Sequence, residues 1–77
     1  MAKAYLKIDI ETGKETDVKA ALKKIGGVKS ADFVTGKNDL LALVEGSSFE
    51  EIVTKILGEI RKVKGINKTI TDFVFEW

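Results

Sequence analysis

Along this 77-residue chain, the spacing of apolar residues is first every second residue, as in a strand, and then three to four residues, as in a helix. This change occurs in both halves of the chain. Residues 2–10 alternate between apolar and polar side chains, which predicts a strand with one face on a core. Apolar residues then recur at helical spacing over 18–25 and 49–63. Three further strand-like runs are 28–35, 40–44 and 66–77. The sequence therefore predicts the order strand, helix, strand, strand, helix, strand.

Capping and turn residues separate these segments. Two capping boxes precede the helical segments: Thr12 with Glu15, and Ser48 with Glu51. Gly26-Gly27 and Gly65 follow them, and glycine readily takes the left-handed conformation that ends a helix. We therefore expect each helix to end before these glycines.

The two halves of the chain resemble each other. Residues 24–28 (KIGGV) echo residues 62–66 (KVKGI), and the triplet DFV at 32–34 recurs at 72–74. Two similar βαβ halves make up a ferredoxin-like α+β two-layer sandwich. We therefore predict one domain over residues 1–77, with a four-stranded antiparallel sheet and both helices on one face.

Composition excludes several kinds of chemistry. The chain has no cysteine and no histidine, which excludes tetrahedral zinc, iron–sulfur and thiolate sites and a Ser–His–Asp triad. We expect no metal and no cofactor. A net charge of +1 argues against direct binding of nucleic acid. Because neither a membrane-spanning run nor a signal-peptide pattern is present, we expect a cytoplasmic protein with no membrane partner.

The second face of the predicted sheet is not polar throughout. In the last strand Ile70 and Val74 share one face, and Phe73, Phe75 and Trp77 share the other. Either orientation leaves large apolar groups uncovered, and a chain of this size buries only about 60% of its unfolded surface. We expect a second copy to pack on the open face as an isologous dimer. In the alternative, the last strand curls over its own core and hides the rings.

Several motifs follow one another in a characteristic order. They are Gly27-Val28, Val34-Thr35-Gly36-Lys37-Asn38-Asp39-Leu40, Gly65-Ile66, and Thr69 with Thr71. In order and spacing they resemble the ligand-binding domain of Lrp/AsnC-type (feast/famine) transcription regulators, over nearly the whole chain. Full-length members of that family carry an N-terminal helix-turn-helix. These residues leave no room for one, so the resemblance implies the stand-alone form of the domain.

The resemblance implies a βαββαβ fold that dimerises through its sheets and assembles further into rings of dimers. It also implies that small effectors, usually amino acids, bind in clefts between dimers. The ligand-binding residues implied for this chain are Gly36, Asn38 and Asp39 from one dimer and Thr69 and Thr71 from a neighbour. The family usually has an aromatic residue immediately before the Asp of this turn, where this chain has Asn38.

These residue types suit the two charges of an amino acid. Asp39 offers its ammonium group a charge-assisted hydrogen bond, and Gly36 lets the backbone approach the ligand closely. Thr69 and Thr71, two apart on a strand, point to the same face and can donate their hydroxyls together. Each residue also has a structural interpretation, because Gly, Asn and Asp are common in hairpin turns and threonine is a good strand former.

Three functions are compatible with the sequence. The leading one is a non-enzymatic regulatory module that binds an amino-acid effector at an oligomer interface and modulates full-length Lrp/AsnC-type regulators. The second is a structural module that forms homo- or hetero-oligomers without a ligand, which Asn38 favours. The third, a small enzyme, is disfavoured because no pair of acid–base residues indicates a tuned site.

Overall fold

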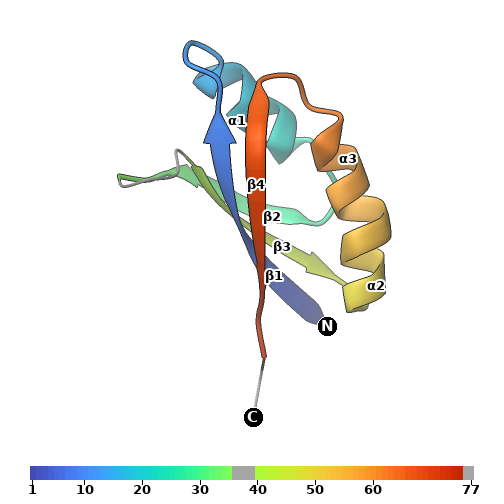
Figure 1. The fold of residues 1–77 in the computed structure, drawn as a ribbon. Helices are drawn as coiled ribbons and strands as arrows, with labels where there is room; N and C mark the ends of the chain where they lie inside the picture. Colours follow the sequence, from blue (N-terminus) through green and yellow to red (C-terminus); the bar gives the residue numbers. More distant parts are fainter. Residues whose placement is uncertain (36–39, 76–77) are drawn as a thin grey trace.

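Strands and helices follow one another in the order that the sequence predicts (Figure 1). The structure is a computed structural model that describes residues 1–35 and 40–75. Its strands are β1 (Ala2–Ile10), β2 (Val28–Phe33), β3 (Leu40–Gly46) and β4 (Ile66–Phe73). Its helical elements are α1 (Glu15–Lys23), α2 (Phe49–Glu51), the π-helical η1 (Ile52–Ile56) and α3 (Leu57–Arg61), the last three forming one continuous segment.

The four strands form one antiparallel sheet in the order β2-β3-β1-β4. The third strand therefore lies in the interior of the sheet, as its apolar residues on both faces predict. Both helical segments cover the same face of this sheet (Figure 1). The predicted ferredoxin-like α+β sandwich is confirmed, and β4 forms one edge of it.

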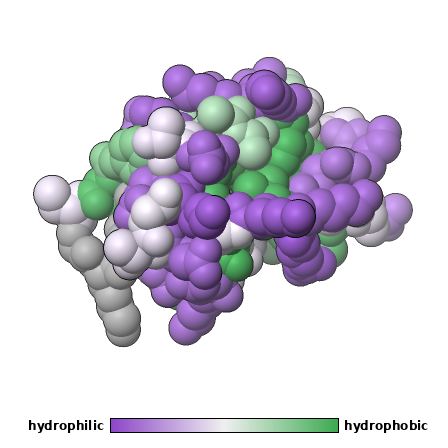
Figure 2. Space-filling model, turned by 90° about the horizontal axis from the view of Figure 1, so that it is seen from above, coloured by the Kyte–Doolittle hydropathy of each residue, from purple (hydrophilic) through white to green (hydrophobic). Residues whose placement is uncertain are grey.

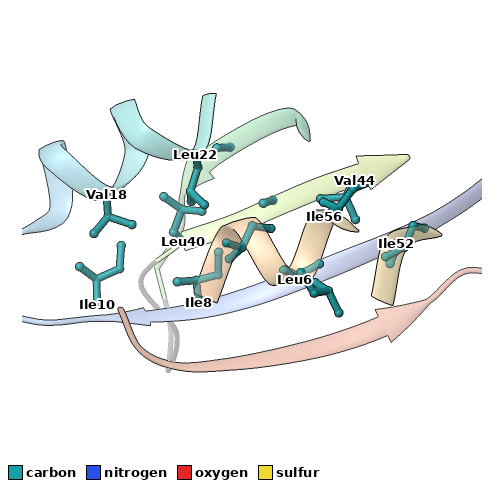
Figure 3. Close-up of a cluster of buried hydrophobic side chains, with 14 of the residues drawn as sticks. Leu6, Ile8, Ile10, Val18, Leu22, Leu40, Val44, Ile52 and Ile56 are labelled. Atoms are coloured by element: carbon teal, nitrogen blue, oxygen red, sulfur yellow. The ribbon is translucent and has the colours of Figure 1, made fainter. Parts of the chain in front are cut away.

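The core lies between the helices and the covered face of the sheet. The alternation in β1 is strict, with five apolar side chains at most 8% exposed on this face: Ala2, Ala4, Leu6, Ile8 and Ile10. In Figure 3, Val18 and Leu22 of α1 and Ile52 and Ile56 of the second segment point toward the strands. These fully or largely buried side chains supply the hydrophobic free energy that holds the two layers together.

The echo between the two halves corresponds to a repeated structural device. Gly27 and Gly65 both have left-handed backbone, with φ of 98° and 100°. The carbonyl of Gly27 accepts a hydrogen bond from the Glu45 amide at 2.8 Å, and that of Gly65 accepts one from the Glu11 amide at 2.7 Å. Each glycine thus bonds to the end of a strand in the other half, and the prediction that glycines follow the helix ends is confirmed.

The predicted cap of the second helix is confirmed. The Glu51 amide donates to the Ser48 hydroxyl at 3.1 Å, and the Ser47 amide donates to the Glu51 carboxylate at 2.9 Å. The hydrogen bond from the Ser47 backbone lowers the pKa of Glu51 below its ordinary value of 4.5, and the Lys55 ammonium adds a smaller contribution in the same direction.

The cap predicted for the first helix is wrong. Helix α1 begins at Glu15, so Lys14 occupies the N-cap position, and its side chain makes no capping hydrogen bond. Thr12 therefore lies two residues before the N-cap position and does not cap the free amides of the helix. The Glu15 carboxylate instead accepts a hydrogen bond from the Gly13 amide at 2.9 Å.

The last strand is shorter than predicted, and the ring of its last residue, Phe73, packs against the core. Phe73 pairs with Ala4, which places both on the helix-covered face, and it packs against the core. Its ring lies 5.0 Å from that of Phe49, in an edge-to-face arrangement. The alternative in which the last strand covers its own core therefore holds for Phe73. Phe75 follows the strand and is 75% exposed, and Trp77 lies outside the described residues.

Candidate functional site

The predicted ligand-binding residues of the hairpin cannot be placed. Gly36, Asn38 and Asp39 lie outside the described residues, so their role stays a prediction. The strands that flank them are described, and Phe33 of β2 pairs with Leu40 of β3. β2 and β3 therefore form the antiparallel hairpin that the sequence predicts.

The two predicted threonines lie on the edge strand β4. Thr69 pairs with Ile8 and Thr71 pairs with Leu6, so the two share one face, as predicted, and the pairing shows that it is the helix-covered face. Both side chains are half-buried. Neither hydroxyl makes a side-chain hydrogen bond to another described residue. Two adjacent hydroxyls are thus free to bind a ligand or water.

The sheet register relates these threonines to the hairpin. Ile8 of β1 lies between Leu40 of β3 and Thr69 of β4 in a single row across the sheet. The backbones of Leu40 and Thr69 are therefore two strand spacings apart, a distance of roughly 10 Å. The start of β3 and the middle of β4 therefore lie in the same row, and both face the helical layer.

The open face of the sheet carries an apolar centre. Its apolar members are Tyr5 of β1, Leu41 and Leu43 of β3, and Ile70 of β4, which we call the open-face cluster. Tyr5 is 44% exposed and Ile70 is 39% exposed, although both lie within regular strands. An apolar centre of this kind on a sheet face is typical of a protein–protein interface.

Charged residues lie within and beside the open-face cluster, and Lys7 sits between Leu41 and Ile70 in one row across the sheet. Lys7 of β1 makes an ion pair with Asp72 of β4 at 3.2 Å, and both side chains are about half exposed. An exposed pair of this kind contributes about 0–1 kcal/mol to stability. Lys3 and Glu45 lie directly opposite each other on the same face. The open face thus combines apolar side chains with charged ones interleaved among them.

An apolar hollow beside α2 was not predicted. It has a volume of about 410 Å³, and apolar side chains form most of its wall: Phe49, Val53, Phe73 and Phe75. The Phe49 and Phe75 rings lie 6.3 Å apart in an edge-to-face arrangement. The sequence signal was the pair Phe49 and Val53, four residues apart on one side of the helix, which lie exposed while Ile52, Ile56 and Ile60 are buried.

Hydrophilic groups cover most of the end of the molecule at which β4 begins (Figure 2). Apolar groups show there only between them. Among the described residues, no helix is long and apolar enough to cross a membrane.

With the fold and its threonine pair defined, the chain can be compared with known proteins. Residues 3–76 match the Lrp/AsnC ligand binding domain. The chain belongs to this family. The family domain is a regulatory ligand-binding unit of transcription regulators, and the match covers nearly the whole chain, as the motifs predicted.

Solved structures of the family share this fold. The crystal structure of FFRP-DM1 has a TM-score of 0.90 and 31% identity, over 97% of this chain and 100% of that one. The feast or famine regulatory protein of Mycobacterium tuberculosis complexed with L-methionine has a TM-score of 0.79 and 22% identity, over 100% of this chain and 52% of that one.

Relatives among curated proteins are longer than this chain. An uncharacterised HTH-type transcriptional regulator of Pyrococcus abyssi is 29% identical over 62 residues, which make up 80% of this chain and 41% of that protein. A corresponding regulator of Pyrococcus horikoshii is 32% identical over 57 residues, 74% of this chain and 38% of that protein. The chain therefore spans about two fifths of the length of these relatives.

Proposed function

We propose that this chain is a non-enzymatic, cytoplasmic regulatory module that binds an amino-acid effector at an interface between its own copies. Through mixed assemblies it modulates the oligomeric state, and hence the DNA affinity, of full-length Lrp/AsnC regulators. The observation that carries the proposal is the pair of half-buried threonine hydroxyls, Thr69 and Thr71, in a chain whose family domain binds ligands. The methionine complex of the M. tuberculosis regulator supports an amino acid as the class of effector.

The chemistry of the threonine pair supports this class of ligand. Two hydroxyls on one face can both donate to a carboxylate, and such charge-assisted bonds are roughly twice as strong as neutral ones. In the proposed site, Asp39 of a neighbouring dimer takes the ammonium group. A free amino acid is small enough to lodge between dimers, and it carries both charges that the proposed residues recognise.

The open-face cluster supports assembly into the dimers that such clefts require. Burying Leu41 and Leu43 against a second copy removes apolar surface from water, at roughly 25 cal/mol per Å². The charged residues of the open face fix the relative orientation of the two copies, because like charges brought together oppose binding. The proposed dimer is isologous, so each cluster packs on the same cluster of its partner.

A thermal-shift screen of the common amino acids at millimolar concentration tests the effector. At one hundred times the dissociation constant, the bound ligand raises the stability by about 2.7 kcal/mol through linkage. A double variant, Thr69→Val with Thr71→Val, keeps the shape of both side chains and removes both hydroxyls. We expect it to fold and to lose the shift. If no amino acid gives either a shift in melting temperature or calorimetric heat, the proposal that the chain binds an amino-acid effector is wrong.

An assembly module without a ligand is the second candidate, and the open-face cluster favours it independently of the threonines. The variant Leu43→Arg places a charge at the centre of this cluster. We expect light scattering to give a multiple of 8.5 kDa for the wild type and a smaller mass for the variant. Oligomers that ignore every amino acid but capture a helix-turn-helix regulator would favour this candidate over the first.

A further inference from the structure

A second hollow lies at the end of the sheet where β1 begins, away from the β2–β3 hairpin. It has a volume of about 700 Å³ and is formed where the turn after α1 meets the turn between β3 and α2. Gly26 and Gly27 form one wall, and Gly46 and Ser47 form another. A Cβ atom built on Gly26 would meet nothing within 4 Å, so the backbone there is open to a ligand.

Three lysines from separate elements line this hollow, which we call the lysine hollow. Lys24 follows α1, Lys29 belongs to β2, and Lys55 belongs to η1. Within the described residues, none of their ammonium groups lies within 4.0 Å of a carboxylate. These positive charges therefore converge on one space, and Lys55 is also close enough to the Glu51 carboxylate to lower its pKa.

The carboxylates of the same hollow are already engaged or directed elsewhere. Glu51 accepts the hydrogen bond from the Ser47 amide, and Glu59 pairs with Lys62 at 3.7 Å. Glu45 lies on the open face of the sheet, opposite Lys3. Because Glu59 and Glu45 have basic neighbours of their own, Glu51 offsets only part of the positive charge of the three lysines.

The lining also has an apolar part, since Ile25 and Ile56 contribute to it. Ligand sites of comparable volume combine apolar walls with a few polar groups that fix the orientation of the ligand. Lysine ammonium groups bind phosphate as compact point charges. We propose that the lysine hollow is a second ligand site, distinct from the effector site, that binds a small phosphorylated molecule with an apolar group.

Titration of the full chain, followed by amide chemical shifts in NMR spectra, tests this site. The probes are phenyl phosphate, inorganic phosphate and the neutral benzyl alcohol, at low ionic strength. We expect phenyl phosphate to give saturable shifts at Gly26, Gly27 and Ser47, and to bind more tightly than either of the other two. Absence of saturable shifts at these amides overturns the proposal.

A pair of matched variants separates a site from general attraction to positive charge. Lys29→Gln with Lys55→Gln removes two charges from the lysine hollow, while Lys64→Gln with Lys68→Gln removes two exposed charges near the start of β4, at the other end of the sheet. We expect the first pair to weaken phenyl phosphate binding roughly tenfold or more, since it removes charge-assisted bonds, and the control pair to change it little. Equal weakening by both pairs would show that these are ordinary solvated lysines.

Discussion

The two βαβ halves of the molecule share the way their helices end but not the way they begin. After each helix, the carbonyl of a left-handed glycine accepts a hydrogen bond from an amide at the end of a strand of the other half or directly after it. At the start, only the second helix has a side-chain cap, from Ser48 and Glu51. The shared feature is the glycine hydrogen bond, which joins the two halves and therefore depends on the structure of both.

The interiors of the two helical segments also differ. Helix α1 is a regular helix, whereas the second segment contains the π-helical turn η1. The Thr54 hydroxyl donates to the Glu50 carbonyl at 2.8 Å at this place, and such bonds are found where helices bend. Both hollows are lined in part by η1, with Val53 and Thr54 on one side and Lys55 and Ile56 on the other. The irregular segment thus contributes side chains to both hollows.

Substitution of the two turn glycines gives the largest expected effects in this comparison. An alanine there has to adopt left-handed backbone, which costs about 1–2 kcal/mol. At Gly65 the new Cβ would also lie 2.8 Å from the Cβ of Lys14, an atom that cannot move away without the backbone. We expect Gly65→Ala to lose roughly 2–4 kcal/mol of unfolding free energy in chemical denaturation.

At Gly27 the new Cβ meets mainly the end of the Ile56 side chain, which can shift. Gly27→Ala is therefore expected to cost somewhat less than Gly65→Ala, but still more than about 1 kcal/mol because of its positive φ. Gly26→Ala is the matched control, since its Cβ has open space and its φ is not left-handed. A control as damaging as Gly27→Ala would contradict the conformational explanation.

The caps are expected to differ by a smaller amount. Ser48→Ala removes the hydroxyl that accepts from the Glu51 amide, which we expect to cost about 1 kcal/mol in the same denaturation assay. Thr12→Ala is its counterpart in the first half, and it should be nearly neutral because Thr12 does not cap α1. Comparable losses in the two variants would mean that Thr12 caps the first helix after all.

The pH dependence of the second cap is the smallest expected effect. The pKa of Glu51 is lowered on folding, so its contribution is fully present above the unfolded value of 4.5 and is lost as the pH falls through the lower folded value. Glu51→Gln keeps an acceptor for the Ser47 amide but does not titrate. The stability difference between wild type and this variant should therefore shrink between about pH 5 and pH 3. A difference that stays constant over this range would exclude the lowered pKa.

Most of the fold could be predicted because it depends on periodic patterns. The alternation in β1 and the helical spacing of Val18 and Leu22 each require one face of an element to be buried. The cap at Ser48 was predictable because its pattern sits directly before the helix, whereas the same pattern at Thr12 is displaced from the first helical residue. The sequence did not decide on which face of the sheet Phe73 lies, because this depends on its pairing with Ala4.

The candidate site was predictable only in part. Family motifs indicated Thr69 and Thr71, and the register with Ile8 and Leu6 confirms that they share a face. No local pattern points to the lysine hollow, because Lys55 is far from Lys24 and Lys29 in the sequence and each of the three resembles an ordinary surface lysine. They converge only when the two turns at that end of the sheet meet.

The amino-acid sequence by itself determined which segments form strands and helices, where most of them end, and to which family the domain belongs. The first two depend on neighbours within a few residues along the chain, and the family on the order of motifs along nearly all of it. Only the tertiary structure decided which aromatic ring joins the core, which apolar residues lie on the open face, and where charges gather around a hollow. These outcomes depend on strand register and on turns from distant parts of the chain, and no local pattern encodes either.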